Sequence, residues 1–285
     1  MNLLKSIFVS LYIVIATMAT VYAVQKLLET GAVVPWGGVI LVYAPFLAVL
    51  AWLLLFRNVA RTSAHFPSLI SLGAIGVIGS TASYVRGGSP VASLLAIAGL
   101  SAFLVYAYWY SSFGARHSSR LVVGNMLPAF ELRNTGGELV SSTSLLDKPT
   151  VWLFYRGNWC PLCMAQVKEI AGQYRQLESL GARVALVSPQ PHQNTVSLAK
   201  KFDVAFDFLT DEGNAAAHTL GIAHDHGLPL GMQVLGYASD TVLPTVIITG
   251  QGGRILWVHE TDNYRVRPEP ETYLAVLREQ GALSV

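Results

Sequence analysis

Both cysteines of the 285-residue chain lie in one short motif, NWCPLC, at residues 158–163. The apolar run 151–155 before it predicts a buried strand, and residues 161–180 predict a helix. Cys160 would therefore lie at a helix N-terminus, where unpaired N–H groups and the helix dipole favour a thiolate. Cys163 follows one helical turn later, facing Cys160. The spacing predicts a redox-active dithiol in which Cys160, with a lowered pKa, attacks and Cys163 resolves.

The neighbours of the two cysteines fit this chemistry. Pro161 would occupy the first helical position, where its missing N–H forfeits no hydrogen bond. Arg156 would add positive charge that favours the thiolate, and Trp159 directly precedes the first cysteine. We expect Arg156, Trp159 and Pro161 to shape the site.

Two other uses of a Cys-x-x-Cys pair are disfavoured. A zinc site would need a second cysteine pair or a closely spaced histidine pair, and the sequence contains neither in the required pattern. A purely structural disulfide would close too short a loop to restrain the unfolded chain. The sequence therefore predicts thiol chemistry with no metal and no organic cofactor.

The two halves of the chain differ in charge. Residues 1–120 hold seven Lys/Arg and one acid, a net charge of +6, whereas residues 121–285 carry −4. A weakly acidic C-terminal half offers no surface for nucleic acid. The mean hydropathy of +0.46 indicates a membrane protein, and we divide the chain into a transmembrane region, 1–118, and a redox domain, 119–285.

The N-terminal region contains four apolar runs, each near the ~20 residues that a membrane-crossing helix needs: 6–24, 38–56, 67–85 and 91–112. The first run also resembles a signal peptide, with Val21-Tyr22-Ala23 as its cleavage site. Both interpretations leave the redox domain on the cytoplasmic side, which the excess of positive charge on that side favours. We expect the helices to anchor the protein in a lipid bilayer, and no span contains a cysteine or a central acidic residue.

The C-terminal half alternates strand and helix patterns, which predicts an α/β layered domain. Further strands are expected at 183–187, 206–209, 244–249 and 254–259, and helices at 193–202, 213–220 and 270–281. Residues 223–241 match neither period and are interpreted as a loop or an insertion.

Residues 154–163 (FYRGNWCPLC) resemble the active-site strand and helix of the peroxiredoxin-like branch of the alkyl hydroperoxide reductase/thiol-specific antioxidant (AhpC/TSA) family. Later segments of that branch resemble Ser188-Pro189-Gln190, Leu209-Thr210-Asp211, Asn263-Tyr264-Arg265 and Arg267–Glu271. The resemblance covers about residues 122–283 and implies the thioredoxin fold. It also implies that Leu243-Pro244-Thr245 corresponds to the cis-proline segment of that fold, which packs beside the redox pair.

The chain departs from the family pattern at two places. Typical peroxiredoxins carry Thr or Ser three residues before the attacking cysteine, where this chain has Gly157. They usually also place an arginine just before the late strand, where this chain has Leu243-Pro244. Both groups polarise the peroxide in that family.

Three functions follow as hypotheses, and the sequence favours the first, because Trp-Cys-x-x-Cys with a cis-proline resembles a thioredoxin-type disulfide reductase. The first is a membrane-anchored thiol-disulfide oxidoreductase that takes electrons from a dithiol donor. The second is a thiol-dependent peroxidase, and the third is a non-catalytic thioredoxin-fold binding module on a membrane protein. The substrate would be a protein disulfide in the first and a peroxide in the second, with Cys160, Cys163 and Pro244 in the site of both.

Overall fold

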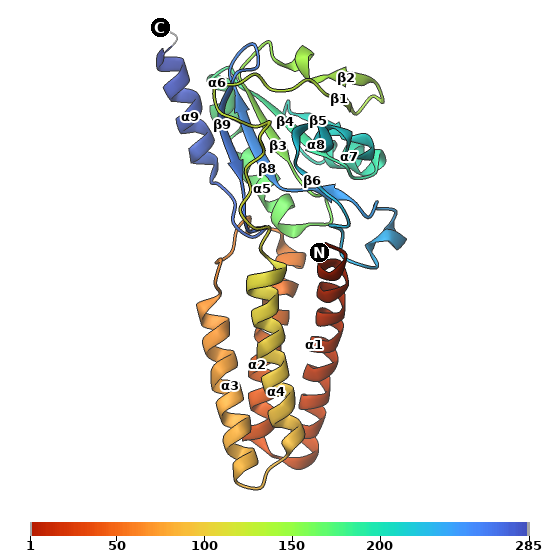
Figure 1. Cartoon of the computed structure of the whole chain (residues 1–285), viewed down its shortest axis with the longest axis vertical. Coiled ribbons are helices and arrows are strands. Elements are labelled where there is room, and N and C mark those ends of the chain that lie inside the picture. Colours follow the sequence, from red (N-terminus) through yellow and green to blue (C-terminus); the bar gives the residue numbers. More distant parts are fainter. Residues whose placement is uncertain (1, 284–285) are drawn as a thin grey trace. The chain divides into compact units, whose positions relative to one another are not determined.

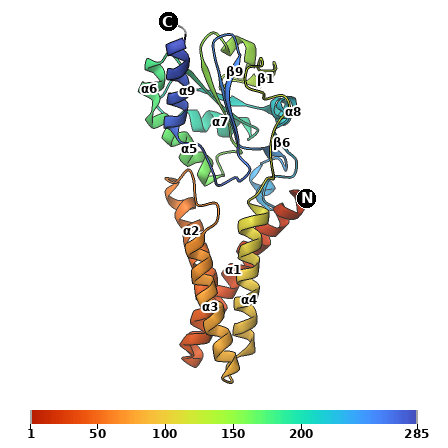
Figure 2. The same ribbon diagram turned by 60° about the vertical axis from the view of Figure 1, so that its left-hand side comes forward.

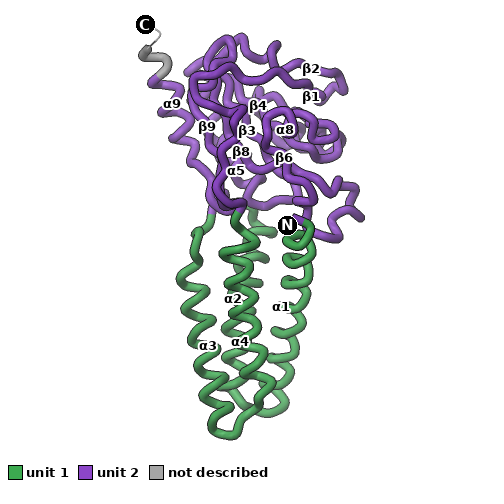
Figure 3. Tube along the Cα trace, in the orientation of Figure 1, with its two compact units in different colours: residues 1, 3–57, 62–112 green, residues 2, 58–61, 113–285 purple. Residues whose placement is uncertain are grey.

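The structure is a computed structural model that describes residues 2–283, so the expected outer limits at Met1 and Val285 lie outside it. The chain divides into two compact units (Figure 3). Unit 1 holds residues 3–57 and 62–112. Unit 2 holds the short segment 58–61 and the chain from Phe113 onward.

Unit 1 consists of four helices (Figure 1): α1 (Asn2–Thr30), α2 (Val33–Phe56), α3 (Pro67–Val85) and α4 (Pro90–Leu104), the last continued by the π-helical turn Val105–Tyr110. Each is long and apolar enough to cross a membrane, counting α4 and the π turn together. The four apolar runs of the sequence are therefore confirmed as helices.

Small residues allow α2 and α3 to approach closely. A side chain added at Gly76 would meet the carbonyl oxygen of Gly38 at 2.4 Å. Ser80 fills the next turn and donates a hydrogen bond of 2.8 Å to the carbonyl of Pro35. Glycine and serine thus replace bulky apolar side chains at this contact, as is common where helices pack inside lipid.

Unit 2 is built on one seven-stranded sheet with the order β2-β1-β5-β4-β3-β8-β9. The strands β3, β4 and β5 are parallel, and the others pair antiparallel. Their bounds are β1 Glu131–Arg133, β2 Leu139–Ser141, β3 Thr150–Phe154, β4 Arg183–Ser188, β5 Asp207–Thr210, β8 Thr245–Thr249 and β9 Ile255–Glu260. A separate two-stranded pair joins β6 (Ala223–His224) to β7 (Thr241–Val242).

Helices cover both faces of the sheet (Figures 1 and 2). They are α5 Pro161–Gly172, α6 Tyr174–Ser179, α7 His192–Ala199, α8 Ala215–Leu220 and α9 Pro270–Leu283, with short helical turns η2 Ser142–Leu145, η3 Glu212–Asn214 and η4 Met232–Leu235. In both views α6 and α9 lie together on the side opposite α8. The predicted fold class, a helical region followed by an α/β thioredoxin-fold domain, is confirmed.

The central strand β3 explains why residues 151–155 are apolar without alternation. Trp152 and Phe154 pack into the cluster that includes Ala217 and Leu220 of α8. Val151 and Leu153 point to the opposite face, and all four strand residues are fully buried. A strand that is covered on both faces needs a continuous apolar run. Because β3 is buried in this way, it holds in place the point at which the cysteine loop leaves the sheet.

Two expectations differ from the structure in detail. The predicted helix 161–180 breaks at Gln173, whose φ of −97° and ψ of 10° separate α5 from α6. The segment 223–241, expected to be irregular, contributes β6, β7 and η4, because its ends pair with each other.

Candidate active site

The two cysteines lie where the sequence predicts. Cys160 is the N-cap residue of α5, with an extended backbone (φ −84°, ψ 112°), and Pro161 occupies the first helical position. Cys163 lies in the first turn, and both cysteines are free thiols. Their exposed fractions are 3% for Cys160 and 0% for Cys163, so the pair is almost closed to solvent.

The loop before the helix requires glycine at one position. Gly157 has a φ of 143°, which residues with side chains rarely adopt. A Cβ atom there would also lie 2.7 Å from Nε1 of Trp159. Gly157 therefore lets the chain turn from β3 into α5 with the indole of Trp159 folded against its backbone.

Electrostatics separate the two thiols in the opposite sense to the sequence-based expectation. The hydrogen bond to Cys163 is the largest cause that raises the pKa of Cys160, and burial adds to it. Burial also raises the pKa of Cys163, but the hydrogen bond from Cys160 and the charge of Arg267 outweigh it and lower that pKa to about 5. The two thiols share one proton and titrate as a pair, and the charge of Arg267 favours the thiolate on Cys163, so the lowered pKa expected at Cys160 stays a prediction.

Arg267 lies in a segment that the sequence analysis compared with the family but did not assign to the site. Its Nη2 lies 3.6 Å from Sγ of Cys163, and its Nη1 donates a 3.3 Å hydrogen bond to Oε1 of Gln166. Nε donates to the carbonyl of Tyr264 at 3.0 Å, and the side chain is 4% exposed. Arg267 belongs to the segment before α9, about 100 residues after the cysteines, so only the folded chain brings it to the sulfur.

Arg156 lies against the same site. Its guanidinium stacks over the rings of Trp159, 4.7 Å from the centroid, and Tyr264, at 5.9 Å. One Nη donates to the carbonyl of Gly227, whereas the buried Nε has no hydrogen-bond partner among the described residues. The backbone N–H of Arg156 helps to lower the pKa of Cys163.

The segment between β6 and β7 covers this arginine. Tyr237 donates a 2.5 Å hydrogen bond to Oδ1 of Asn158, and Thr241 donates to the carbonyl of Arg156 at 3.0 Å. Gln190, after β4, accepts a 2.7 Å hydrogen bond from the N–H of Asn158. A space of about 10 Å³, roughly one water molecule, remains among these groups.

Pro244 is brought to the same edge of the sheet but not in the expected form. Thr245 pairs with Phe154 across β8 and β3, so Pro244 lies beside the strand end from which the cysteine loop begins. No cis peptide bond occurs within residues 2–283, and the expected cis-proline is therefore wrong. The carbonyl of Pro244 accepts a 3.2 Å hydrogen bond from Arg116.

Residues 123–258 match the sequence model of the AhpC/TSA family. The matched range contains both cysteines, Arg156 and the sheet except for the end of β9. The C-terminal unit therefore resembles proteins of that family, and we refer to it below as the peroxiredoxin-like domain.

Similar proteins agree with this assignment. Chloroplastic peroxiredoxin Q of Gentiana triflora is 30% identical over 116 residues, 40% of this chain and 54% of the relative. A putative peroxiredoxin bcp of Helicobacter pylori is 29% identical over 133 residues, 47% of this chain and 84% of the relative. The chain spans about half the length of the first curated relatives that it matches.

Among solved structures, peroxidoxin BcpB of Mycobacterium tuberculosis aligns with a TM-score of 0.47 at 19% identity, over 55% of this chain and 96% of that one. The match to the family model stops before Arg267. The arginine nearest Cys163 therefore lies in a part of the peroxiredoxin-like domain that the family comparison does not cover.

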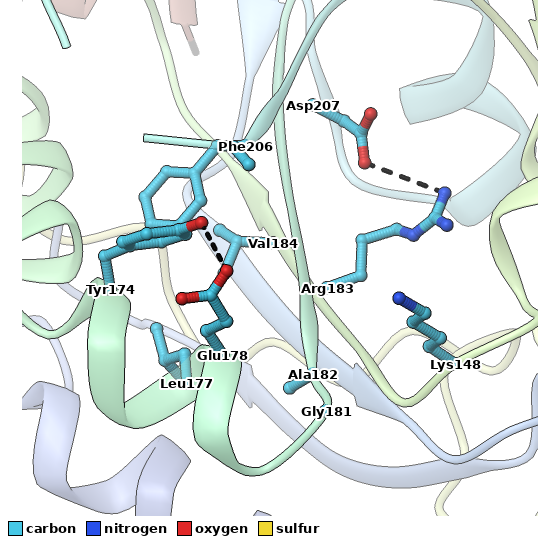
Figure 4. Close-up of a pocket in the computed structure, with 11 residues that line it drawn as sticks. Lys148, Tyr174, Leu177, Glu178, Gly181, Ala182, Arg183, Val184, Phe206 and Asp207 are labelled. Atoms are coloured by element: carbon cyan, nitrogen blue, oxygen red, sulfur yellow. Dashed lines mark hydrogen bonds and ion pairs between the residues drawn. The ribbon is translucent and has the colours of Figure 1, made fainter. Parts of the chain in front are cut away.

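The peroxiredoxin-like domain has a second, larger hollow of about 270 Å³ where β4 and β5 begin (Figure 4). Arg183 pairs there with Asp147 at 2.9 Å and with Asp207 at 3.7 Å. Tyr174 donates to Glu178 at 2.7 Å and packs against Phe206. None of its lining residues is a cysteine or a histidine, so this hollow offers no thiol for redox chemistry.

Proposed function

We propose that the protein is a thiol-dependent peroxidase in which Cys163 attacks the peroxide and Cys160 resolves the product. One observation carries the proposal: the sulfur of Cys163 is held between the Cys160 thiol and the guanidinium of Arg267. Those two donors stabilise a thiolate at neutral pH, and the thiolate is the form that attacks peroxides. The similarity to peroxiredoxins supports the same chemistry.

The exchanged roles also remove a departure from the family pattern. Counting from Cys163, the position three residues earlier holds Cys160, which donates a hydrogen bond to the attacking sulfur. Typical peroxiredoxins have the hydroxyl of Thr or Ser there. Arg267 supplies the positive charge that the segment Leu243-Pro244 lacks.

The proposed reaction conserves atoms and electrons. The thiolate of Cys163 attacks the terminal oxygen of the peroxide ROOH and the O–O bond breaks. Cys163 becomes a sulfenic acid, and the departing RO⁻ takes a proton from water to leave as ROH. The thiol of Cys160 then attacks that sulfur, water leaves, and a Cys160–Cys163 disulfide forms. An external dithiol returns the pair to the reduced state by thiol–disulfide exchange and becomes a disulfide itself.

Burial favours a small substrate over a protein disulfide. A peroxide can reach a fully buried sulfur after a small side-chain displacement, whereas a folded protein substrate needs an exposed one. The buried Nε of Arg156 and the N–H groups at the start of α5 lie on this side of the domain and can bind the peroxide oxygens.

A thiol-disulfide oxidoreductase remains the second candidate. Cys160 is the less buried thiol and follows Trp159 at the N-terminus of α5, the position of an attacking cysteine in a dithiol reductase. In that reaction Cys160 would attack the substrate disulfide, and Cys163 would release the mixed disulfide.

Stopped-flow oxidation of the reduced full chain, followed through the fluorescence of Trp159, separates the two reactions. We expect hydrogen peroxide to oxidise the pair at least about 100-fold faster than it oxidises an ordinary free thiol. A model protein disulfide should react slowly. Fast disulfide exchange together with ordinary peroxide reactivity would favour the second candidate.

We further propose that the four apolar helices anchor the protein in a lipid bilayer with the peroxiredoxin-like domain on the cytoplasmic side. The excess of Lys/Arg in the connections expected on that side supports this orientation. A membrane-impermeant thiol reagent should label the cysteines only after cells are permeabilised and the protein is denatured. If the reagent labels the cysteines in cells that have been treated with denaturant but not permeabilised, the domain lies outside.

A further inference from the structure

The connection between α2 and α3 contributes a piece of chain to unit 2. Residues 58–61 cluster with that unit, although they lie between two apolar helices of unit 1. Ala60 is 1% exposed, so the segment is embedded rather than loosely apposed. The residue that reaches furthest from it is Arg61.

Arg61 joins the cysteine helix to the segment that carries Arg267. Its guanidinium forms a two-point contact with the carboxylate of Glu169 on α5, with Nη2–Oε2 at 2.5 Å and Nη1–Oε1 at 3.3 Å. Its Nε donates to the backbone carbonyl of Arg267 at 3.3 Å, and its Nη2 donates to that of Pro268 at 3.3 Å. Glu269 lies 3.9 Å from Nη1 and completes the charged surroundings.

Helix α5 and the segment that carries Arg267 also contact each other at the sulfur of Cys163. Cys163, Gln166 and Glu169 repeat every three residues along α5 and so share one face. The side chain of Arg267 contacts Cys163 and Gln166. The side chain of Arg61 binds both the carbonyl of Arg267 and the carboxylate of Glu169. Arg61 thus holds the backbone of Arg267 at a fixed position relative to the helix that carries Cys163.

We propose that Arg61 is a positioning residue for the reaction of Cys163, acting through Arg267 from the connection between α2 and α3. The inference deepens the proposed peroxidase and rests on it. A merely structural ion pair of this exposure would contribute little to stability and nothing to the acidity of the thiol.

The test uses Arg61→Gln in the full chain in detergent. Thiolate absorbance at 240 nm is recorded against pH, with Cys163→Ser as the blank, so no peroxide is needed. We expect the midpoint for Cys163 to rise by about 0.5–1 pH unit, a three- to tenfold loss of acidity. This readout separates the inference from the proposed function, because a failed peroxidase assay would leave the titration unaffected.

Two further variants make the result specific. Arg133→Gln breaks another two-point pair with a glutamate, at 2.6 and 2.8 Å, in an arginine with the same 29% side-chain exposure. That pair lies on β1, three strands from β3, so we expect no shift of the midpoint. Arg61→Lys keeps the charge and should restore part of the wild-type value.

A double variant tests the route through Arg267. If Arg61 acts by holding Arg267, adding Arg61→Gln to Arg267→Gln should move the midpoint no further than Arg267→Gln alone. Independent, additive shifts would overturn the proposed route. An unchanged midpoint in a folded Arg61→Gln protein, or an equal shift in Arg133→Gln, would overturn the inference itself.

Discussion

The two ends of the parallel strands β3, β4 and β5 each present an arginine, and the two arginines have different partners. Arg183, where the strands begin, is paired by two carboxylates, Asp147 and Asp207. Arg267, near the cysteines, contacts a sulfur, an amide oxygen and a backbone carbonyl. Only the second guanidinium has no carboxylate to neutralise it among these contacts, so its charge remains available to a thiolate.

This comparison indicates which end of the sheet does chemistry. The larger hollow lies at the Arg183 end, yet its charged groups already satisfy one another. The dithiol end has little open space, but it concentrates unneutralised positive charge around a buried nucleophile. Charge balance rather than the size of the cavity therefore distinguishes the candidate active site.

The largest effect is expected from Arg267→Gln, which keeps a hydrogen-bond donor beside Cys163 but removes the positive charge that distinguishes the two ends of the strands. We expect the rate of peroxide oxidation at pH 7 to fall about 100-fold, since removal of one preorganised donor commonly has that effect. Arg183→Gln is the matched control at the other end and should change the rate less than about twofold. Equal losses in the two variants would show that the charge at the dithiol end has no special role.

The pH dependence of the reaction sharpens the same contrast. With the pKa of Cys163 lowered to about 5, its thiolate is present at pH 7 and is lost only as the pH falls through that value. The oxidation rate should stay level from about pH 8 to 6 and fall about tenfold per unit well below pH 5. A rate that still climbs between pH 7 and 9 would mean that Cys163 keeps the pKa of an ordinary thiol.

Two glycine-to-alanine substitutions compare how much backbone strain the cysteine end and the Arg183 end of the strands can accept. Gly157→Ala should destabilise the protein by more than about 2 kcal/mol, because strained φ and the 2.7 Å contact with Trp159 act together. Gly181, in the wall of the Arg183 hollow, also has a positive φ of 65° but nothing within 4 Å of an added Cβ. Gly181→Ala should therefore cost only about 1 kcal/mol, and urea unfolding monitored by tryptophan fluorescence measures both.

The smallest expected effect concerns the segment that covers Arg156. Tyr237→Phe removes the hydrogen bond to Asn158 and should loosen residues 223–242, with a change of about 1 kcal/mol and less than a tenfold change in rate. Hydrogen exchange of that segment should increase while exchange in β4 and β5 stays unchanged. Uniform acceleration across the sheet would mean that the bond supports the whole fold.

Sequence periodicity predicted the elements well, because local patterns determine them. The continuous apolar run 151–155 identified β3, and Pro161 marked the start of α5 within the motif. The four apolar runs of unit 1 needed only length and composition. The break at Gln173 also has a local signal, since Gly172, a poor helix former, ends α5 directly before it, but the helix period alone did not reveal the break.

The electrostatics of the site could not be read in the same way. Assigning the attacking role to Cys160 used only its place at the helix end, whereas the shared proton and Arg267 act across the folded chain. Arg267 is about 100 residues from Cys163, and Arg61 is a similar distance on the other side. Arg61 lies in the polar connection RNVARTSAH between two apolar runs, and nothing in its local sequence indicates a role at the thiols.

The most direct test of the account identifies which sulfur a peroxide oxidises first. Full-length Cys160→Ser and Cys163→Ser proteins are mixed with one equivalent of hydrogen peroxide, and sulfenic acid is trapped with dimedone and located by mass spectrometry. The account predicts rapid sulfenic acid formation at Cys163 in Cys160→Ser and only the slow reaction of an ordinary thiol at Cys160 in Cys163→Ser. Rapid oxidation of Cys160 with an inert Cys163 would contradict it and return the attacking role to the helix-capping cysteine.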